Sequence, residues 1–274
     1  AAYNFDDCTS TNSLNGFDGV ENGKFECVCG YSGQAYKFDG TQSLQLGQDK
    51  SGLNNALTEN EFSFAAAILS PATNGPMTIL SVQADCNSNG YQLVYDPRTA
   101  NFIMYFNVGT QEVVSFPADI GTCWQYVAFT RSLNNFIFYL NGREVKQFTF
   151  RINPNLKSDT NPIIGNAVCN NGASPFRGLI DEIRIYTRLI GKDRAITLTG
   201  SKINKLSDHF QVVFPGRPYA VSFLASCPGM ISWSPITGVS DPTALQVELT
   251  ADVTTRYSVS YNYEGCTQSD TILL

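Results

Sequence analysis

Residues 176–190 read FRGLIDEIRIYTRLI, and the alternation of side chains in this stretch indicates a long β-strand. Successive side chains of a strand point to opposite faces of the sheet. The stretch would place Leu179, Asp181, Ile183 and Ile185 on one face and Ile180, Glu182, Arg184 and Tyr186 on the other. Because apolar residues occur on both faces, we expect both to be covered and the strand to lie well inside a sheet.

Asp181 would then share its face with three aliphatic side chains. Burying a carboxylate alone is costly, so it must meet hydrogen-bond donors, a cation or a metal. We favour a structural role for Asp181 as a hydrogen-bond acceptor over a role as a ligand. Gly178, just before it, predicts a point where the backbone bends or approaches another segment.

The composition of the 274 residues is that of a globular, strand-rich protein. Hydrophobic residues make up 43% and charged residues only 15%, and turn-forming residues are abundant. The length allows one large β domain and one small one. The net charge of −6 argues against a nucleic-acid surface and is compatible with a cation-dependent binder or a binder of neutral ligands. No apolar run approaches the ~18 residues of a membrane span.

The eight cysteines predict structural disulfides in an oxidising compartment, and hence a secreted or cell-surface protein. None has a zinc-type spacing, and Cys27 and Cys29 are too close in the chain to bridge each other easily. We expect Cys227 to pair with Cys266, Cys8 with Cys27 or Cys29, and, among Cys86, Cys123 and Cys169, Cys86 with Cys123. The sequence alone does not fix these connections.

Five motifs follow one another along the first part of the chain. They are a short strand ending in Phe5-Asp6, GQAYKFDG at 33–40, CWQYVAFTR at 123–131 with the hairpin NNFIFYLNG at 134–142, PIIG at 162–165, and the strand at 176–186 before a helical turn at 191–196. This series resembles laminin-G-like, concanavalin A-like jelly-roll domains. The resemblance implies a jelly-roll sandwich over residues 1–200 and does not specify a ligand.

A second resemblance begins after the polar residues 201–209, which we interpret as a linker. The motifs are WSPITGVSDP at 233–242, TTRYSVSY at 254–261 and GCTQSDTILL at 265–274. They resemble an immunoglobulin-like repeat common in large surface proteins of gliding bacteria that use type IX secretion. The resemblance implies a small β-sandwich over residues 210–274, with Trp233 and Tyr257 in its core and Trp233 packed on a Cys227–Cys266 bridge.

The sequence argues against an enzyme, although hydrolases exist on the same fold. A retaining glycosidase needs two carboxylates ~5.5 Å apart. Asp181 and Glu182 are adjacent and would point to opposite faces of the strand. His209, the one histidine, lies in the expected linker, and the chain has no phosphate-binding glycine motif. We therefore expect no catalytic residues.

An oxygen-rich loop at 85–90 is the main candidate for a metal site. Asp85, Asn87 and Asn89 are candidate Ca²⁺ ligands, because Ca²⁺ prefers oxygen donors. Laminin-G-like domains often hold Ca²⁺ near this loop, so the resemblance implies the same. A disulfide-anchored turn is the simpler interpretation. A second candidate metal site, which we favour less, consists of Asp6, Asp7, Asp18 and Asn22.

Three other residues are candidate contacts for a sugar. Asn170 and Asn171 lie in a predicted loop, and Tyr91 begins a predicted strand. Asn amides suit sugar hydroxyls and aromatic faces suit the CH faces of a sugar ring. Ordinary loop chemistry is the alternative interpretation.

These observations lead to three functional hypotheses. The first is an adhesin or lectin-like binding module that recognises a glycan or a surface protein through rim loops of the jelly roll, with Ca²⁺ as a candidate cofactor. The second is an architectural subunit or spacer of a surface assembly associated with type IX secretion or gliding, in contact with other envelope components. The third is an accessory module of a larger secreted glycoside hydrolase.

Overall fold

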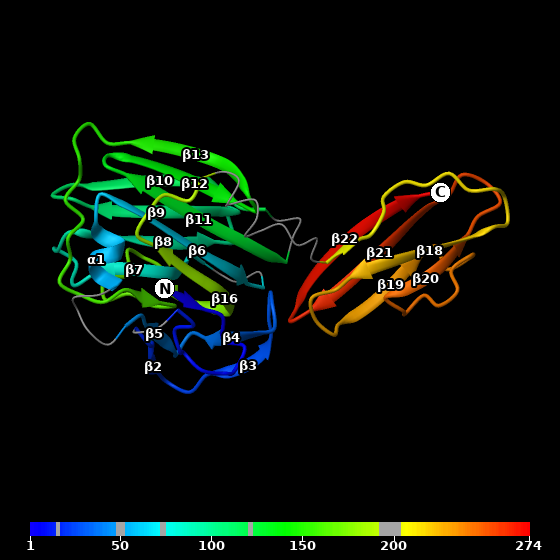
Figure 1. The fold of residues 1–274 in the computed structure, drawn as a ribbon, viewed down its shortest axis with the longest axis horizontal. Helices are drawn as coiled ribbons and strands as arrows, with labels where there is room; N and C mark the ends of the chain where they lie inside the picture. The colour runs from blue at the N-terminus through cyan, green and yellow to red at the C-terminus, as the bar shows by residue number, and fades with distance from the viewer. Residues whose placement is uncertain (15–16, 48–52, 72–74, 120–122, 192–203) are drawn as a thin grey trace. The chain divides into compact units, whose positions relative to one another are not determined.

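The alternating stretches form strands, and the predicted all-β fold is confirmed. The computed structural model describes residues 1–14, 17–47, 53–71, 75–119, 123–191 and 204–274. The chain divides into two units, one of residues 1–120 with 124–200 and one of residues 121–123 with 201–274. Figure 1 labels most of the strands of both units.

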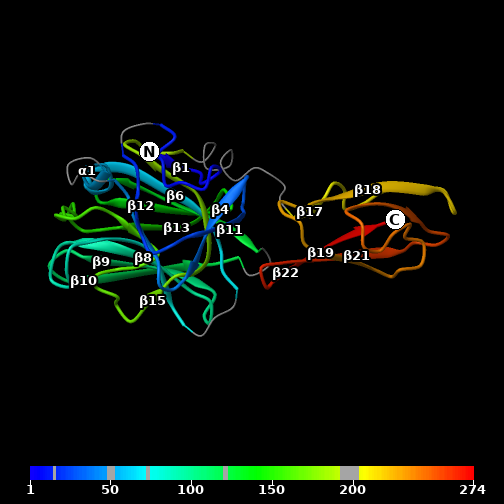
Figure 2. The same ribbon diagram turned by 90° about the horizontal axis from the view of Figure 1, so that it is seen from below.

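The first unit is a sandwich of two eight-stranded sheets, which Figure 2 shows as two layers. The first sheet has the order β13-β12-β11-β6-β16-β4-β3, and β1 pairs with β16. Its strands are β1 (Ala2–Tyr3), β3 (Glu26–Cys29), β4 (Gln34–Asp39), β6 (Glu61–Leu69), β11 (Trp124–Ser132), β12 (Asn135–Leu140), β13 (Arg143–Thr149) and β16 (Arg177–Tyr186).

The second sheet has the order β10-β9-β8-β7-β14-β5-β2, and β15 pairs with β7 in parallel. Its strands are β2 (Val20–Asn22), β5 (Ser43–Gln45), β7 (Met77–Gln83), β8 (Gly90–Asp96), β9 (Asn101–Asn107), β10 (Gln111–Pro117), β14 (Ile163–Ile164) and β15 (Ser174–Pro175). The short helix α1 (Leu53–Thr58) comes between β5 and β6 in the chain.

The core lies between the two sheets because alternate side chains of each strand point inward. Aromatic rings from opposite sheets meet there. Phe106 of β9 packs on Phe136 of β12, and Phe116 of β10 packs on Phe138 of β12, with ring centroids 4.8 Å apart in both pairs. The outer face of each sheet is therefore left for loops or ligands.

The predicted hairpin between β12 and β13 is confirmed. Asn141 and Gly142 both have positive φ, 47° and 77°. A two-residue turn with this geometry matches the right-handed twist of the flanking strands, which is why Asn-Gly predicts it.

β16 lies inside the first sheet, between β6 and β4, as expected. The strict alternation predicted for it is wrong, because the pairing with β6 shifts by one residue between Asp181 and Arg184. Glu182 at this bulge has a φ of 52°, and the extra residue resets the side-chain direction. As a result Ile180, Ile183 and Ile185 all pack in the core, whereas Asp181 does not belong to it.

Gly178 is a close approach, as the sequence predicted. Its φ is +141°, and a Cβ added there would lie 2.2 Å from the carbonyl oxygen of Leu69 on the neighbouring strand. Only glycine fits such a position without displacing the backbone.

The second unit contains two three-stranded sheets, β17-β18-β20 and β19-β21-β22. Their strands are β17 (Lys205–Leu206), β18 (Pro218–Leu224), β19 (Met230–Ser234), β20 (Gln246–Thr250), β21 (Arg256–Tyr263) and β22 (Cys266–Leu273). Trp233 and Tyr257 lie in the core of this unit, as expected. The Trp233 indole N–H donates to the carbonyl oxygen of Ala244 at 3.0 Å.

The expected linker is partly wrong. Lys205 and Leu206 form β17, which pairs with β18, so these residues belong to a sheet of the second unit. Residues 201–203 of the predicted linker, and residues 192–196 of the predicted helical turn, lie outside the described residues.

All eight cysteines are disulfide-bonded, as predicted. Cys8 bonds to Cys27, which was one of the two expected pairs. The predicted Cys86–Cys123 and Cys227–Cys266 pairs are wrong, because the bonds are Cys86–Cys169 and Cys123–Cys266. Trp233 therefore does not pack on a Cys227–Cys266 bridge.

The wrong pairs have a physical origin. Cys123 and its partner Cys266 are 143 positions apart in the chain and belong to the same unit, a pairing that local sequence patterns do not reveal. In the described part of the chain, no helix has the length and hydropathy needed to cross a membrane.

Candidate binding site

Two loops that the sequence singled out are joined by the Cys86–Cys169 disulfide. One follows β7 and carries Asp85, Asn87 and Asn89, and the other precedes β15 and carries Asn170 and Asn171. The two bonded cysteines are 83 positions apart in the chain, but their Cα atoms are only 4.9 Å apart. The structure thus brings the candidate metal ligands and two of the candidate sugar contacts to one side of the second sheet.

An amide side chain at the end of β9 holds the first loop. Asn107 donates from Nδ2 to the carbonyl oxygens of Cys86, at 3.2 Å, and Ser88, at 2.9 Å. These carbonyls lie in a loop, and the Ser88 carbonyl also accepts from Gln83 Nε2 at 3.1 Å, so side-chain amides satisfy them and fix the turn.

A chain of amides holds the second loop. Gln111 of β10 donates to Asn171 Oδ1 at 3.0 Å, and Asn171 Nδ2 donates to Oε1 of Gln92 on β8 at 2.8 Å. Gln92 in turn donates to the carbonyl oxygen of Cys169. Because Asn171 reaches both β8 and β10, its side chain crosses over β9, which lies between them.

Asp85 is the one carboxylate of the first loop, and it is already used in the turn. Its Oδ1 accepts the backbone N–H groups of Asn87, at 2.7 Å, and Ser88, at 2.9 Å. Ca²⁺ takes six to eight oxygen ligands, several of them usually carboxylates. Within the described residues, no group of three or more His, Cys, Asp or Glu side chains is placed to hold a metal. Asp85 is thus engaged in the turn, and bound Ca²⁺ stays a prediction.

The second candidate metal site is dispersed among local contacts. Its members make the following hydrogen bonds: Asp6 Oδ1 accepts from the backbone of Gln34, Asp7 Oδ1 from Thr9, and Asp18 Oδ1 from the backbone of Asn12, while Asn22 donates to Ser43. The hydrogen bond from the Thr9 hydroxyl lowers the pKa of Asp7. Each side chain therefore serves its own turn or strand.

The prediction that Tyr91 contacts a ligand is wrong. Its side chain is 0% exposed and its ring packs among Phe62, Phe106 and Phe129 in the core. The hydroxyl donates to the carbonyl oxygen of Leu57 at 2.9 Å. Burial raises the pKa of the hydroxyl well above its usual value.

The aromatic side chain on the outer face is instead Tyr105, on the neighbouring strand β9. The core takes Phe102, Met104 and Phe106 from this strand, so Tyr105 faces outward, half-buried. The local sequence did not carry this signal, because residues 102–106 read FIMYF, an unbroken apolar run. Tyr105 pairs with Val113 of β10, whose side chain is 53% exposed.

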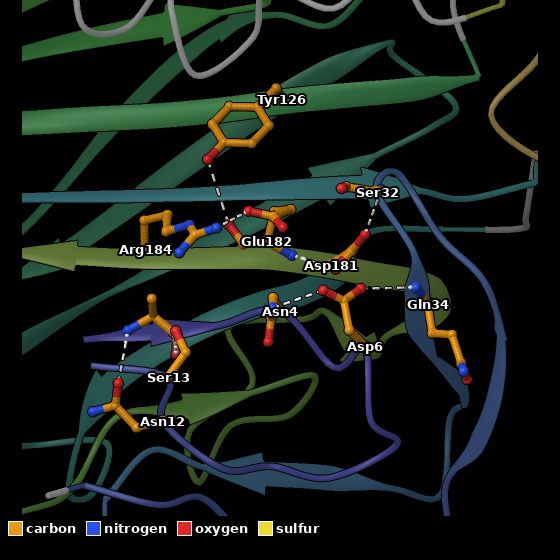
Figure 3. A network of polar contacts seen from close by, with 11 residues as sticks. Asn4, Asp6, Asn12, Ser13, Ser32, Gln34, Tyr126, Asp181, Glu182 and Arg184 are labelled. Carbon is orange, nitrogen blue, oxygen red and sulfur yellow. Dashed lines mark hydrogen bonds and ion pairs between the residues drawn. The ribbon is translucent and has the colours of Figure 1, made fainter. Parts of the chain in front are cut away.

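A separate polar network surrounds Asp181 in the first sheet (Figure 3). The Asp181 side chain is 0% exposed and accepts the backbone N–H of Ser32 at 3.0 Å and of Glu182 at 2.6 Å. It is the structural acceptor that the sequence predicted. Asp6 Oδ1 accepts the backbone N–H of Gln34, two residues after Ser32 at the start of β4, at 3.2 Å. Burial is the main cause that raises the pKa of Asp181 to about 8.

The neighbouring carboxylate of Glu182 is also engaged. It forms an ion pair with Arg184, and the carbonyl oxygen of Glu182 accepts from the Tyr126 hydroxyl at 3.4 Å (Figure 3). Asp181 and Glu182 therefore have separate structural partners, and they do not present the facing acid and nucleophile of a glycosidase.

The sequence of the first unit matches a known protein family. Residues 31–194 match the concanavalin A-like lectin/glucanases superfamily. The chain belongs to this superfamily. No curated protein matches the chain.

Solved structures with the superfamily's fold include two kinds of binding domain. Domain 4 of AbnA, a GH43 extracellular arabinanase from Geobacillus stearothermophilus solved with arabinotriose, has a TM-score of 0.57 at 20% identity and covers 73% of this chain and 97% of that chain. The binding domain of botulinum neurotoxin DC, solved with rat synaptotagmin II, has a TM-score of 0.55 at 13% identity. The match covers 92% of this chain and 68% of that chain. At these identities the likeness shows the fold alone.

Proposed function

We propose that this superfamily member is a secreted or cell-surface binding module that recognises a glycan through the loops joined by Cys86–Cys169. The disulfide carries the proposal, because it holds two polar loops together on the outer side of one sheet. Asn170 is exposed in the second loop and Asn171 fixes that loop on the sheet, and amides suit sugar hydroxyls. A protein partner at the same loops is the alternative within this class.

Other features support a binding role. One structural neighbour is described in complex with arabinotriose, and another with synaptotagmin II; these ligands belong to those proteins. The disulfides suit an extracellular location. The engaged carboxylates Asp181 and Glu182 favour a module that does no bond-breaking chemistry.

A glycan array, read with and without EDTA, tests this function. Binding that is lost in Asn170→Ala/Asn171→Ala and kept in the exposed-loop control Asn155→Ala is the expected result. A loss with EDTA that Ca²⁺ restores would support the predicted cofactor. An array on which no glycan binds above background would contradict the function.

A second candidate function is architectural, and it rests on the second unit. Phe210, Val212 and Phe214 are 64%, 75% and 80% exposed, and exposed apolar side chains in one segment mark protein contacts. With the sequence motifs, this favours an immunoglobulin-like spacer in a type IX secretion or gliding assembly. We expect the wild type to pull down an envelope protein from an extract and the Phe214→Ser variant not to do so. An accessory role beside a hydrolase is a third proposal, supported by the AbnA neighbour.

A further inference from the structure

The outer face of β8, β9 and β10 carries a surface that extends beyond the two loops. Register across these strands places Gln92 opposite Tyr105, Tyr105 opposite Val113, and Asn107 opposite Gln111. Paired side chains share a face, and the core side chains of β9 occupy the other one. The outer-face surface therefore consists of Gln92, Tyr105, Asn107, Gln111 and Val113.

Tyr105 and Val113 form its apolar part. They lie on adjacent strands in direct register, where side chains are in contact. Val113 is 53% exposed and Tyr105 half-buried, so part of each remains open to solvent. A ring held on a sheet offers a flat face to the CH groups of a sugar, and a ring loses little side-chain entropy when it binds.

Gln111 is a polar member of this surface, and Asn171 of the adjoining loop bonds to it. The Gln111 side chain is exposed, and its Nε2 is held by Asn171 Oδ1 at 3.0 Å. Since Asn171 is itself bonded to Gln92, the amides are fixed before any ligand arrives. The fixed amide still has an Nε2 hydrogen and an Oε1 acceptor to offer to a hydroxyl group.

The charge of this face selects among glycans. The carboxylate on the same face of β8, Asp96, is only 5% exposed and forms an ion pair with Arg98 at 3.3 Å. The five members of the outer-face surface are uncharged, and the chain as a whole carries a net charge of −6. Sialylated or sulfated glycans would meet no cation in this surface and would be repelled by the chain.

We propose that the outer face of β9 and β10 binds an uncharged saccharide, with a sugar ring on Tyr105 and Val113 and hydroxyl groups on Gln111 and the Asn170–Asn171 loop. This inference rests on the proposed glycan-binding function and adds to it a location and a ligand class. The two disulfide-linked loops then form one wall of the site, and the strands form its floor.

The test uses the full chain and named probes. An array of neutral tetrasaccharides from cellulose, xylan, mannan and arabinan is compared with sialyllactose and a heparin tetrasaccharide. Calorimetry then measures the tightest neutral probe against Tyr105→Ala, Tyr105→Phe and Gln111→Ala. Gln147→Ala, an exposed glutamine on β13 of the other sheet, is the matched control.

We expect neutral probes to bind and the anionic ones not to. Tyr105→Ala should weaken binding at least about tenfold, Gln111→Ala about three- to tenfold, and Tyr105→Phe and Gln147→Ala less than about twofold. If circular dichroism shows that Tyr105→Ala is misfolded, the affinity of Gln111→Ala, a variant at an exposed residue, tests the inference instead.

Two results would overturn the inference while leaving the proposed function intact. One is binding that depends on Asn170 and Asn171 but is unchanged in Tyr105→Ala and Gln111→Ala. The other is a preference for the anionic probes. If neither the neutral nor the anionic probes bind, both the inference and the proposed glycan-binding function are wrong.

Discussion

Cys86 and Cys169 are bonded to each other, and the backbone of each cysteine also accepts a hydrogen bond from a side-chain amide of β8 or β9. The backbone carbonyl of Cys86 accepts from Asn107, and the backbone carbonyl of Cys169 accepts from Gln92. The covalent bond and the hydrogen bonds therefore fix the same two loops on β8 and β9. This arrangement turns two distant loops of the chain into one surface.

Removing this disulfide should cost both stability and binding. The bond closes a chain segment of 83 residues, so its loss in Cys86→Ser/Cys169→Ser should lower the free energy of unfolding by about 4 kcal/mol. Glycan binding should be lost as well, because the loops are no longer held together. Urea unfolding and calorimetry measure the two effects.

The Cys8–Cys27 bond is the matched control. It closes only 19 residues, so Cys8→Ser/Cys27→Ser should cost less, about 3 kcal/mol, and leave glycan binding unchanged. Equal losses of binding in both double variants would contradict the role assigned to Cys86–Cys169.

Asp181 should make the stability of the first unit depend on pH. Its pKa is about 8 in the folded protein, whereas the usual pKa of an aspartate side chain is 3.8. Between these values the unfolded chain has lost a proton that the folded chain keeps, so stability falls as pH rises from 4 to 8. Asp181→Asn cannot ionise, so its stability relative to wild type should increase steadily from pH 5 to pH 8.

Urea-unfolding midpoints at pH 5, 6, 7 and 8 measure this difference. The control is Asp85→Asn, which makes the same chemical substitution at an exposed aspartate. A constant gap between Asp181→Asn and wild type across this range would show that Asp181 is ionised throughout.

Gly178→Ala should be strongly destabilising. The new methyl group would lie 2.2 Å from the backbone oxygen of Leu69, at a φ of +141°, which corresponds to a loss of about 3 kcal/mol or more. Gly109→Ala also has a positive φ, +92°, but no atom within 4 Å of the added Cβ. It should cost only about 1 kcal/mol, and thermal unfolding compares the two. Similar losses of stability in the two variants would show that the close approach of Gly178 to Leu69 does not contribute to the effect.

Tyr91→Phe separates a core role from a ligand-binding role. The variant removes the hydroxyl that satisfies the carbonyl oxygen of Leu57, so the free energy of unfolding should fall by about 1–2 kcal/mol. Binding of the tightest neutral tetrasaccharide should not change, because the ring is 0% exposed. A weakened affinity with unchanged stability would instead show that Tyr91 contacts the ligand.

The sequence predicted the features that depend on local patterns. The Asn141–Gly142 turn and the glycine constraint at 178 both follow from backbone geometry within a few residues. The inward position of Tyr91 was also readable, since it shares its parity with Leu93 and Tyr95 of the same strand.

The remaining features depend on contacts between distant segments. The bulge at Glu182, which reverses the directions of Ile183 and Ile185, comes from pairing with β6 and leaves no mark in the local pattern. The Cys86–Cys169 pair depends on which loops meet above β8 and β9. For the same reason, Tyr105 joins Asn171 and Gln111 only once the strand register is known.

The most direct measurement of the central claim is a map of backbone amide chemical shifts as the protein is titrated with the tightest-binding neutral tetrasaccharide. The account predicts that the shifts concentrate at Tyr105, Gln111 and Val113 and in the loop of Asn170 and Asn171. Shifts concentrated on the outer face of the first sheet, around β11 and β12, would contradict it.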